Sequence, residues 1–551
     1  MPGSIPVYEN SKAHLRVRRK LQTVMAGLLL LAGVCAGTGT AHATGTISPI
    51  AHGNFKLRAT YDFTSQVAAG LAANTRLSPV SLSSLAGTGA AGKVGLCYPE
   101  PFHPGVRAEG YCWNNVDDTG SGGWNPQGLS VPHGTTADSD GWYQSRRWEV
   151  VSWSAGSSQA KLRFVDRGAT GDPAATPRYF DVRLVTVSAN GAMTNMASHN
   201  DSVVWYGKHL LVGTGGILQF FHLDNLQRDL DRASGYDYVL PLTLQYRTTE
   251  QISQICSVLN NNTCMSSLSF DRQNSALVSG EFRGNRMVRW PFDLSTGLPD
   301  SDGGAIFGDT TASGAWYTPV NQMQGALFAQ GKFFMSGSCP SGYNNGYREN
   351  SCIYKAGSGE APYVLTSAPD MTQNLDWDSS AAGGQGRIRG VNEVGRADKE
   401  HSQRLVFSIK STADQIETFR LKNVNSGKCL VPYSAGLDNN ATVVQWDCSG
   451  TNAQDWYWNG SEIRNFQSKR CLSVKDGSSS NGAVLEQFEC RGYRAQYWYT
   501  APGSAGGALL VNHGSGLCAT INGGSAAHDA HAVQWACNST HPAHAWIGTG
   551  K

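Results

Sequence analysis

The sequence predicts an all-β protein of at least two domains. Its 551 residues exceed the roughly 100–200 residues of a typical single domain. Only 16% of the residues are charged, whereas 64 are glycine, 15 tryptophan and 20 tyrosine. Glycine penalises helix interiors and aromatic residues favour strands, so this composition argues against a long-helix protein and against a disordered chain. The formal net charge is only +2, so we expect no nucleic acid partner.

The first 43 residues predict a secretory signal peptide. Lysines and arginines between positions 12 and 20 precede an apolar run at 24–36, and the small-x-small triplet Ala41-His42-Ala43 follows. The run is shorter than the roughly 20 residues that span a bilayer, and no later segment approaches that length. We therefore expect a secreted, extracellular mature protein with no membrane partner. The pair Arg18-Arg19 leaves both Sec and twin-arginine export open.

Of the 13 cysteines, all but Cys35 lie beyond this leader, and they fall in close pairs. An even number of cysteines in a secreted chain predicts disulfides. Because no Cys-x-x-Cys occurs, neither a zinc ribbon nor a thioredoxin-like site is supported, and we expect no metal and no cofactor. The expected disulfides are Cys97–Cys112, Cys256–Cys264, Cys339–Cys352, Cys429–Cys448, Cys471–Cys490 and Cys518–Cys537.

The last three cysteine pairs belong to an internal repeat. In each pair the second cysteine follows the first by 19 residues, a glutamine and an aromatic residue lie shortly before it, and a tryptophan follows it. One such unit cannot bury its own apolar face, so we expect three units to pack around a pseudo-threefold axis. The repeated residues are Gln445-Trp446, Gln487-Phe488 and Gln534-Trp535, followed by Trp456, Trp498 and Trp546.

These motifs resemble the ricin B-type lectin β-trefoil, from about residue 415 to 549. The resemblance implies a domain that binds sugars, typically galactose- or xylose-type units, in one shallow pocket per repeat. It also implies which side chains line those pockets. The candidate carbohydrate-binding residues are the aromatic platforms Trp446, Phe488 and Trp535, the polar residues Gln454, Gln496 and His544 of the Gln-x-Trp positions, and Ser473 and Thr520.

The expected pockets depart from the family pattern at their acidic acceptor. The Asp that the family places two positions after the first cysteine is Val431, Ser473 or Thr520 here. Only the two hydroxyls can accept a hydrogen bond, so we expect weak sites, with the second and third repeats stronger than the first. The glutamines of the Gln-x-Trp motifs also have a structural alternative, because they can fill the trefoil core. The turn at 528–531, His-Asp-Ala-His, is interpreted as solvated rather than metal-binding.

Residues 44–412 show short apolar runs bounded by Gly, Pro, Asn and Asp, and no helix-length amphipathic pattern. A strand, a glycine turn, a second strand and then a strand ending in Asp recur, as in 206–224 and 275–293. Four antiparallel strands per unit around an axis is the β-propeller plan. The region therefore resembles a secreted β-propeller of five to seven blades, with a pair of β-sandwiches as the alternative. Expected strands include 148–153, 182–187, 203–213, 276–280, 287–290, 326–336 and 404–409.

This region yields no catalytic assignment. It contains no Gly-x-Ser-x-Gly, no His-Glu-x-x-His and no phosphate-binding loop. A glycosidase needs two carboxylates about 5–9.5 Å apart, although Asp and Glu are also ordinary turn residues. The carboxylates near apparent inner strands are Asp201, Asp271, Asp370, Glu393 and Glu281.

Taken together, the sequence favours a secreted carbohydrate-binding protein, acting as a monomer, whose trefoil tethers a propeller to polysaccharide or glycan. The alternative is a secreted glycoside hydrolase with a catalytic propeller and a targeting lectin domain. A third hypothesis is a non-enzymatic scaffold in which both domains bind protein. The predicted organisation is a signal peptide at 1–43, a β-propeller-like domain at 44–412 and a ricin B-type trefoil at 415–549.

Overall fold

The computed structural model describes residues 45–96, 102, 106, 108–114, 123–156, 159–172, 175–251, 256–257, 260–340, 351–380, 386–393, 404–412, 418–459 and 461–550. The predicted leader at 1–43 lies outside these ranges. Within them the chain is almost entirely strand and turn, with a single α-helix, α1 (Thr64–Ala73). The all-β prediction is therefore confirmed. In this described part no helix is long and apolar enough to cross a membrane.

The sequence shows no helix-length amphipathic pattern, and α1 is a helix without one. Its alanine-rich sequence favours a helix, but it buries only Val67 and Gly70, so no apolar period marks it. Gly70 is the point of contact with the sheet. A Cβ on Gly70 would lie 2.3 Å from the carbonyl oxygen of Ser188, so only glycine allows this approach.

Among the described residues of 125–409, together with one earlier strand, five antiparallel units of four strands recur, numbered here as the first to the fifth sheet. Short strands extend several of these units, and a parallel pairing of residues 183–185 with 239–241 joins the first unit to the second. The first sheet contains β7 (Asn125–Ser130), β10 (Arg146–Ala155), β11 (Gln159–Asp166) and β12 (Arg178–Val187), and the second β14 (Ser202–Tyr206), β15 (His209–Thr214), β16 (Ile217–His222) and β18 (Tyr238–Arg247). The third contains β19 (Ser267–Asp271), β20 (Ala276–Gly280), β21 (Arg286–Asp293) and β24 (Gly314–Tyr317), and the fourth β25 (Gly325–Ala329), β26 (Lys332–Ser338), β27 (Ser351–Ala356) and β28 (Tyr363–Ala368). The fifth contains β29 (Thr372–Asp378), β30 (Arg387–Asn392), β31 (Leu405–Ile409) and β6 (Glu109–Cys112).

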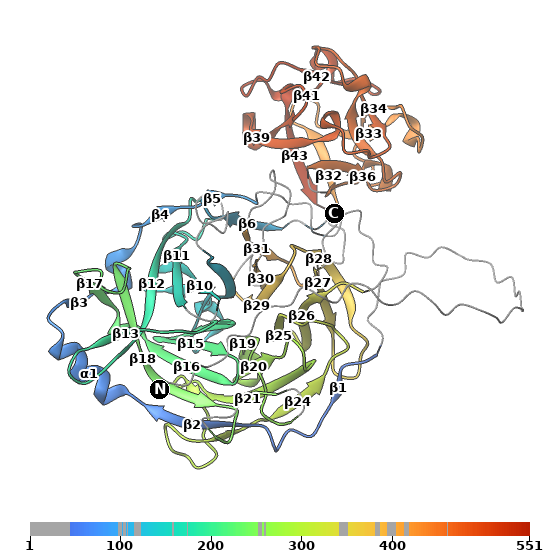
Figure 1. Ribbon diagram of the computed structural model, residues 1–551. Helices are drawn as coiled ribbons and strands as arrows, with labels where there is room; N and C mark the ends of the chain where they lie inside the picture. Colours follow the sequence, from blue (N-terminus) through green and yellow to red (C-terminus); the bar gives the residue numbers. More distant parts are fainter. Residues whose placement is uncertain are drawn as a thin grey trace, which may run out of the picture. The chain divides into compact units, whose positions relative to one another are not determined.

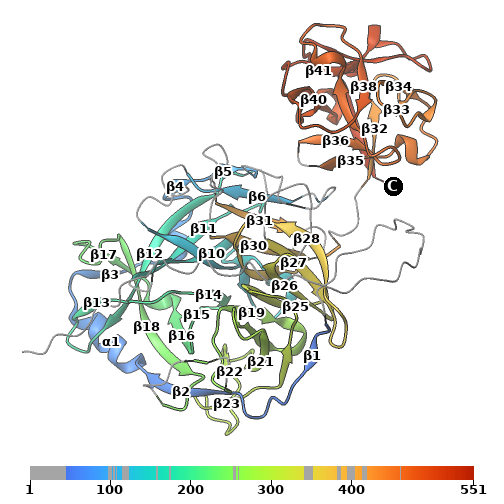
Figure 2. The ribbon, with the colours of Figure 1, turned by 45° about the vertical axis from the view of Figure 1, so that its right-hand side comes forward.

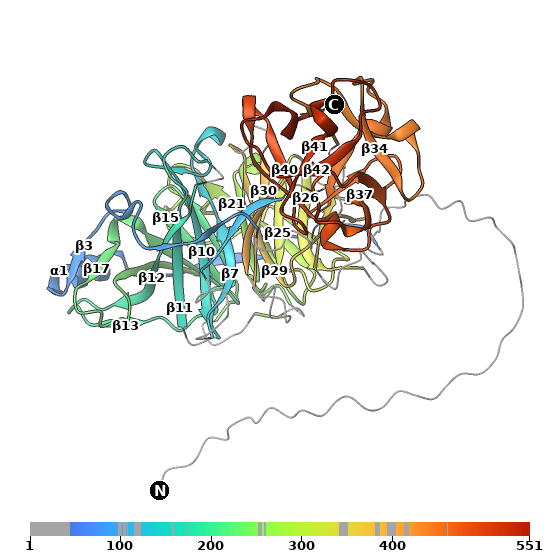
Figure 3. The same ribbon diagram turned by 90° about the horizontal axis from the view of Figure 1, so that it is seen from above.

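The five sheets surround a common centre in a nearly closed arrangement (Figures 1 and 2). Their first strands, β7, β14, β19, β25 and β29, contact one another there. Seen from above, the strands of neighbouring sheets stand side by side (Figure 3). The expected strand segments coincide with β10, β12, β14, β15, β20, β21, β25, β26 and β31.

Strand β6 closes this arrangement. It precedes the first sheet in the sequence but pairs with β31 of the fifth, with Cys112 opposite Leu405 and Glu109 opposite Ser408. Apolar clusters fill the space between sheets, and large side chains such as Trp148 and Trp205 are fully buried in one of them. Burying a large apolar side chain contributes about 1.5–3 kcal/mol, so these clusters supply the main driving force for this region.

The C-terminal region, residues 418–550, is a sheet of twelve short strands that closes on itself, since β32 pairs with both β33 and β35. Its three repeats share one hairpin register, in which the first cysteine lies opposite the aromatic platform. The strands are β32 (Phe419–Asn423), β33 (Cys429–Pro432), β34 (Ala441–Trp446), β35 (Trp456–Asn459), β36 (Glu462–Asn465), β37 (Cys471–Val474), β38 (Leu485–Phe488), β39 (Trp498–Pro502), β40 (Ala508–Asn512), β41 (Cys518–Ile521), β42 (Ala532–Trp535) and β43 (Ala545–Gly550).

Repeated polar side chains fix the backbone of this region. Each repeat has a buried glutamine whose amide nitrogen donates to two backbone carbonyls of another repeat: Gln487 bonds Gly436 and Asp438 at 2.7 and 3.0 Å. Gln534 and Gln445 repeat this pattern, so the three repeats are joined in a cycle. The buried indoles donate to carbonyls in the same way, at 2.9–3.0 Å, from Trp456, Trp498 and Trp546 to Leu430, Leu472 and Ala519.

Five of the six expected disulfides are present. They are Cys256–Cys264, Cys339–Cys352, Cys429–Cys448, Cys471–Cys490 and Cys518–Cys537. Cys97 lies outside the described residues. The equal spacing of the last three pairs therefore marks one point of a repeated hairpin, as the sequence predicted.

Candidate functional site

A pocket of about 340 Å³ lies on the first repeat of the C-terminal region. Trp446 forms one wall and is 41% exposed, although it is large and apolar. The lining also includes residues of β33 and of the 3₁₀ turn Tyr433–Ala435, and Asp529 of the third repeat. The pocket thus combines an aromatic surface with a carboxylate from a distant part of the sequence.

Trp446 is directed outward by strand alternation. It follows the fully buried Gln445 on β34, and successive side chains of a strand point to opposite faces. The ring of His528 stacks on the indole with ring centres 4.3 Å apart, and its Nε2 lies 3.0 Å from Asp447 Oδ2. Hydrogen bonds from Lys428 and His528 lower the pKa of Asp447 below its usual value. The His528 ring therefore packs against the Trp446 indole, and Asp447 holds that ring in position.

Gln454 and Gln496 hold equivalent structural positions. The buried Gln454 accepts from the Ser449 N–H at 2.8 Å and donates to the Asp447 carbonyl at 2.7 Å. Gln496 makes the same pair of bonds, at 2.9 and 2.8 Å, across its own loop. Both amides therefore brace the loop after each disulfide, and Gln454 also lines the pocket.

The other predicted residues are placed differently from one repeat to the next. Ser473 and Thr520 are buried, and the Thr520 hydroxyl donates to the Ala543 carbonyl at 2.9 Å. His544 is buried, and this burial lowers its pKa. Phe488 is half-buried with the Arg491 guanidinium 5.5 Å from its ring centre, whereas Trp535 is 45% exposed. The platforms thus remain accessible in all three repeats, while the hydroxyls do not lie on the surface.

Asp529 is the pocket residue that sequence reasoning missed. Its backbone is left-handed, with a φ of 57°, and its N–H donates to the Gln445 carbonyl at 3.1 Å. The corresponding residues, Asn440 and Gly482, have φ values of 66° and 81° and bond the glutamines beside the other two platforms. Asn, Asp and Gly are the residue types that tolerate this conformation. The signal was available, because all three residues lie six positions before a platform, but they belong to the neighbouring repeat in space.

Residues 417–546 match the family model of the ricin-type beta-trefoil lectin domain. The resemblance expected from the sequence is therefore confirmed, and this segment is called the lectin domain below. Such a domain implies carbohydrate binding. No curated protein matches the chain.

Several solved structures are similar to parts of the chain. An exo-beta-1,3-galactanase from Clostridium thermocellum is 14% identical, with 74% of this chain and 94% of that chain covered and a TM-score of 0.32. The designed threefold-symmetric protein ThreeFoil is 25% identical, with 24% and 97% covered and a TM-score of 0.23. The Rhizoctonia solani agglutinin is 15% identical, with 24% and 95% covered and a TM-score of 0.23.

The carboxylates singled out in the N-terminal region are dispersed. Asp271 ends β19 and pairs with Arg289 at 2.9 Å, whereas Glu281 lies beyond the opposite end of that strand and pairs with Arg286 at 2.6 Å. Burial raises the pKa of Asp271. Both carboxylates are thus used in buried ion pairs, and the sheet separates them.

Asp201 and Glu393 act on a common neighbour. Asp201 lies 2.7 Å from Nδ1 of the half-exposed His199, and the hydrogen bond to Asp201 raises the pKa of His199, to which the negative charge of Glu393 also contributes. Glu393 accepts from the Gln373 amide at 2.8 Å, and Asp370 accepts from the N–H of the next residue at 3.2 Å.

A buried histidine network was not foreseen. His133 lies between two aspartates, with Nδ1 3.0 Å from Asp140 and Nε2 3.1 Å from Asp376. Burial alone would lower the pKa of His133, but Asp376 and Asp140 raise it to about 10. Asp376 also accepts from the Val131 N–H at 2.8 Å, so this network joins the first sheet to the fifth. All three side chains are buried, which makes the network a structural element.

Proposed function

We propose that this protein is a secreted carbohydrate-binding protein whose lectin domain tethers an N-terminal β-propeller to polysaccharide or glycan. Five sheets with mutually contacting first strands support a propeller of five blades, within the predicted range of five to seven. Five disulfides support an oxidising, extracellular compartment, in agreement with the signal peptide expected at 1–43.

The observation that carries this proposal is the pairing of Trp446 with Asp529 in one pocket. The apolar C–H face of a sugar ring packs on an indole, while its hydroxyls need directional acceptors. A carboxylate is the strongest such acceptor, since hydrogen bonds to charged groups contribute about 1.5–3 kcal/mol. Asp529 therefore supplies the acceptor that Val431 cannot.

The neighbouring repeats support a ranking of the three sites that differs from the sequence expectation. The place that Asp529 takes beside Trp446 is taken by Asn440 beside Phe488 and by Gly482 beside Trp535. A carboxylate accepts a charge-assisted hydrogen bond, an amide accepts a neutral one, and glycine offers no side chain. We therefore rank the first repeat above the second and the second above the third.

The test is calorimetry of the full mature protein with galactose- and xylose-type sugars. Asp529→Asn should weaken binding by about tenfold, as expected for exchanging a charge-assisted hydrogen bond for a neutral one. Trp446→Ala should remove most of the heat, whereas Trp535→Ala, an equally exposed tryptophan in the third repeat, should change little. Unchanged binding in Trp446→Ala would disprove the assignment of the first pocket.

The hydrolase alternative is tested in the same samples. Its carboxylates would be Asp201 and Glu393, since both act on the half-exposed His199. Release of reducing ends from polysaccharide that disappears in Asp201→Asn and Glu393→Gln would favour the hydrolase over a tethered binding protein.

A further inference from the structure

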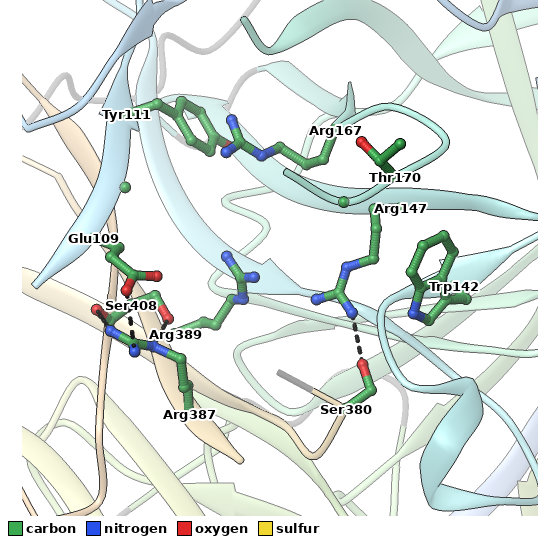
Figure 4. Close-up of a pocket in the computed structure, with 12 residues that line it drawn as sticks. Glu109, Tyr111, Trp142, Arg147, Arg167, Thr170, Ser380, Arg387, Arg389 and Ser408 are labelled. Atoms are coloured by element: carbon green, nitrogen blue, oxygen red, sulfur yellow. Dashed lines mark hydrogen bonds and ion pairs between the residues drawn. The ribbon is translucent and has the colours of Figure 1, made fainter. Parts of the chain in front are cut away.

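A second cleft, unrelated to the lectin domain, lies between the first and fifth sheets and has a volume of about 350 Å³. This volume is at the lower end of the roughly 300–1,000 Å³ of small-molecule sites. Its walls come from β6, β30 and β31 on one side and from β9 (Trp142–Tyr143), β10 and the end of β11 on the other. Four arginines line it, against one carboxylate, Glu109 (Figure 4).

Arg147 and Arg389 point their guanidinium groups toward the middle of this cleft (Figure 4). Both pair with the fully buried Asp378, and Arg389 also bonds Glu149 at 2.7 Å. A guanidinium has five N–H donors. Among the described residues, each of these two arginines uses three of them, so each retains two donors for a ligand.

The position of Arg147 requires two glycines. Gly141 and Gly171 both have left-handed backbones, with φ values of 79° and 67°. A Cβ on Gly141 would lie 2.5 Å from Arg147 Cζ, and one on Gly171 would lie 2.7 Å from Arg147 Cγ. The two glycines therefore leave the space that Arg147 occupies, and its guanidinium is held there by Asp378, Ser380 and the Asp140 carbonyl. A ligand meets donors that are already oriented, which lowers the entropic cost of binding.

The balance of charge in the cleft is positive. The wall contains Arg147, Arg167, Arg387 and Arg389. Among the described residues, Arg147, Arg387 and Arg389 form ion pairs with the carboxylates of Asp378, Glu149 and the half-exposed Glu109. Buried and partly buried arginines hold their charge, and low-dielectric walls focus its field on the cleft. An entering anion is thus attracted, and guanidinium groups match carboxylate and sulfate oxygens in geometry.

An aromatic ring lies beside these donors. The Trp142 ring centre is 5.4 Å from Arg147 Cζ, and the hydroxyl residues Thr170, Ser380 and Ser408 also line the cleft. An indole next to oriented guanidinium groups suits a ligand that has both an apolar ring face and a negative group. An inorganic anion has the negative group but no ring face to pack on the indole.

We infer that this cleft binds an acidic sugar, with the carboxylate of a hexuronate or the sulfate of a sulfated sugar held by Arg147 and Arg389 and the sugar ring against Trp142. The inference concerns residues of the N-terminal region alone and does not depend on the pocket at Trp446. It adds a second carbohydrate site of different chemistry to the protein.

The experiment is calorimetry of the full mature protein with four probes: hexuronate oligosaccharides, sulfated oligosaccharides, neutral oligosaccharides of equal length, and inorganic sulfate. Trp446→Ala should be present in all samples, so that the lectin pocket does not mask the result. At least one acidic probe should bind, about tenfold or more tightly than its neutral counterpart, and the binding should weaken as salt is raised. Equal binding of neutral and acidic sugars overturns the inference. Equal binding of inorganic sulfate also overturns it, because the cleft would then be a simple anion site.

Two variants locate the binding. Arg147→Lys keeps the charge but loses the planar donor pair, and it should weaken the acidic sugar about tenfold. Trp142→Ala lies outside the ion pairs and should weaken the sugar without affecting its salt dependence. The matched control is Arg76→Gln, which removes an exposed positive charge that does not line this cleft. Acidic sugar binding that survives both Arg147→Lys and Trp142→Ala overturns the assignment, and thermal unfolding curves verify that each variant is folded.

Discussion

The two regions of this protein hold their buried polar groups in opposite ways. In the lectin domain the buried groups are mostly neutral amides and indoles, repeated three times, and their partners are backbone carbonyls. In the N-terminal region many of them are charged and occur in individual ion pairs, some of which join side chains far apart in the sequence, as His133 does with Asp376. In the lectin domain, the threefold repeat uses the same side-chain-to-backbone hydrogen bonds three times. The five sheets of the N-terminal region differ in sequence, so each contact between them needs its own pair of side chains.

This contrast has an energetic consequence. Removing one partner of a buried ion pair leaves an uncompensated charge, which costs about 3–5 kcal/mol. Removing a neutral side chain that bonds the backbone leaves unpaired amide groups, which costs about 1–3 kcal/mol. The N-terminal region should therefore be the more sensitive of the two to single polar substitutions.

The largest expected effect is that of Asp376→Asn. The substitution keeps the shape but removes one of the two negative charges that face His133, and the Val131 N–H loses a charged acceptor. We expect a loss of about 3–5 kcal/mol in the free energy of unfolding of the N-terminal region, measured by urea denaturation. The control is Asp224→Asn, whose carboxylate pairs with Lys208 on the surface and should change stability by less than about 1 kcal/mol. Equal effects of the two substitutions would contradict the comparison.

The next effect is that of removing a lectin disulfide. Replacing Cys471 and Cys490 with serine opens a loop whose ends are 19 residues apart. The loop-entropy model gives a loss of about 3 kcal/mol for a loop of this size. Thermal unfolding should show the loss in the lectin transition alone. A shift of the same size in the N-terminal transition would mean that the two regions do not unfold independently.

The pH dependence of stability tests the charged network directly. His133 has a pKa of about 10 in the folded protein, above the 6.5 of an unperturbed histidine. Its stabilising contribution is therefore complete below pH 6.5 and is lost as the pH rises through about 10. We expect a fall of up to about 1.4 kcal/mol per pH unit between these values in denaturation of the N-terminal region. His133→Gln should flatten this part of the profile, and an unchanged slope would show that other groups cause it.

The smallest effect is expected for Gln487→Ala, which removes two bonds between the first and second repeats. The Gly436 and Asp438 carbonyls lose their donor, so we expect a loss of about 1–3 kcal/mol. Gln467→Ala, at an exposed position of the same repeat, is the matched control and should be neutral. If Gln487→Ala lowered stability as much as Asp376→Asn, the glutamine hydrogen bonds of the lectin domain would contribute as much to stability as the His133 network.

The lectin domain was largely predictable because its signals are local and repeated. Cysteine spacing, Gln-Trp pairs and the following tryptophans each mark a hairpin that occurs three times, and the structure forms all three. Strands of the N-terminal region were also predictable, since apolar runs between turn residues define them. Asp529 was missed because it lines a pocket on a different repeat, and the sequence alone does not show which repeats are neighbours in space. His133, Asp140 and Asp376 were missed because their interaction depends on sheets that meet only after folding.

The pairing of β6 with β31 also bears on the order in which the protein is made. The edge of β6 that pairs with β31 stays open until residue 408 has been made, although the other edge can already pair with residues 93–94. Each lectin hairpin, in contrast, joins positions only 17 residues apart. During synthesis from the N-terminus, a ring lacking its final strand pair would expose unpaired backbone groups on β6 and on β30. Such edges can pair with another chain. Until residues 405–409 emerge, these two edges are therefore open to misassembly with other copies of the protein.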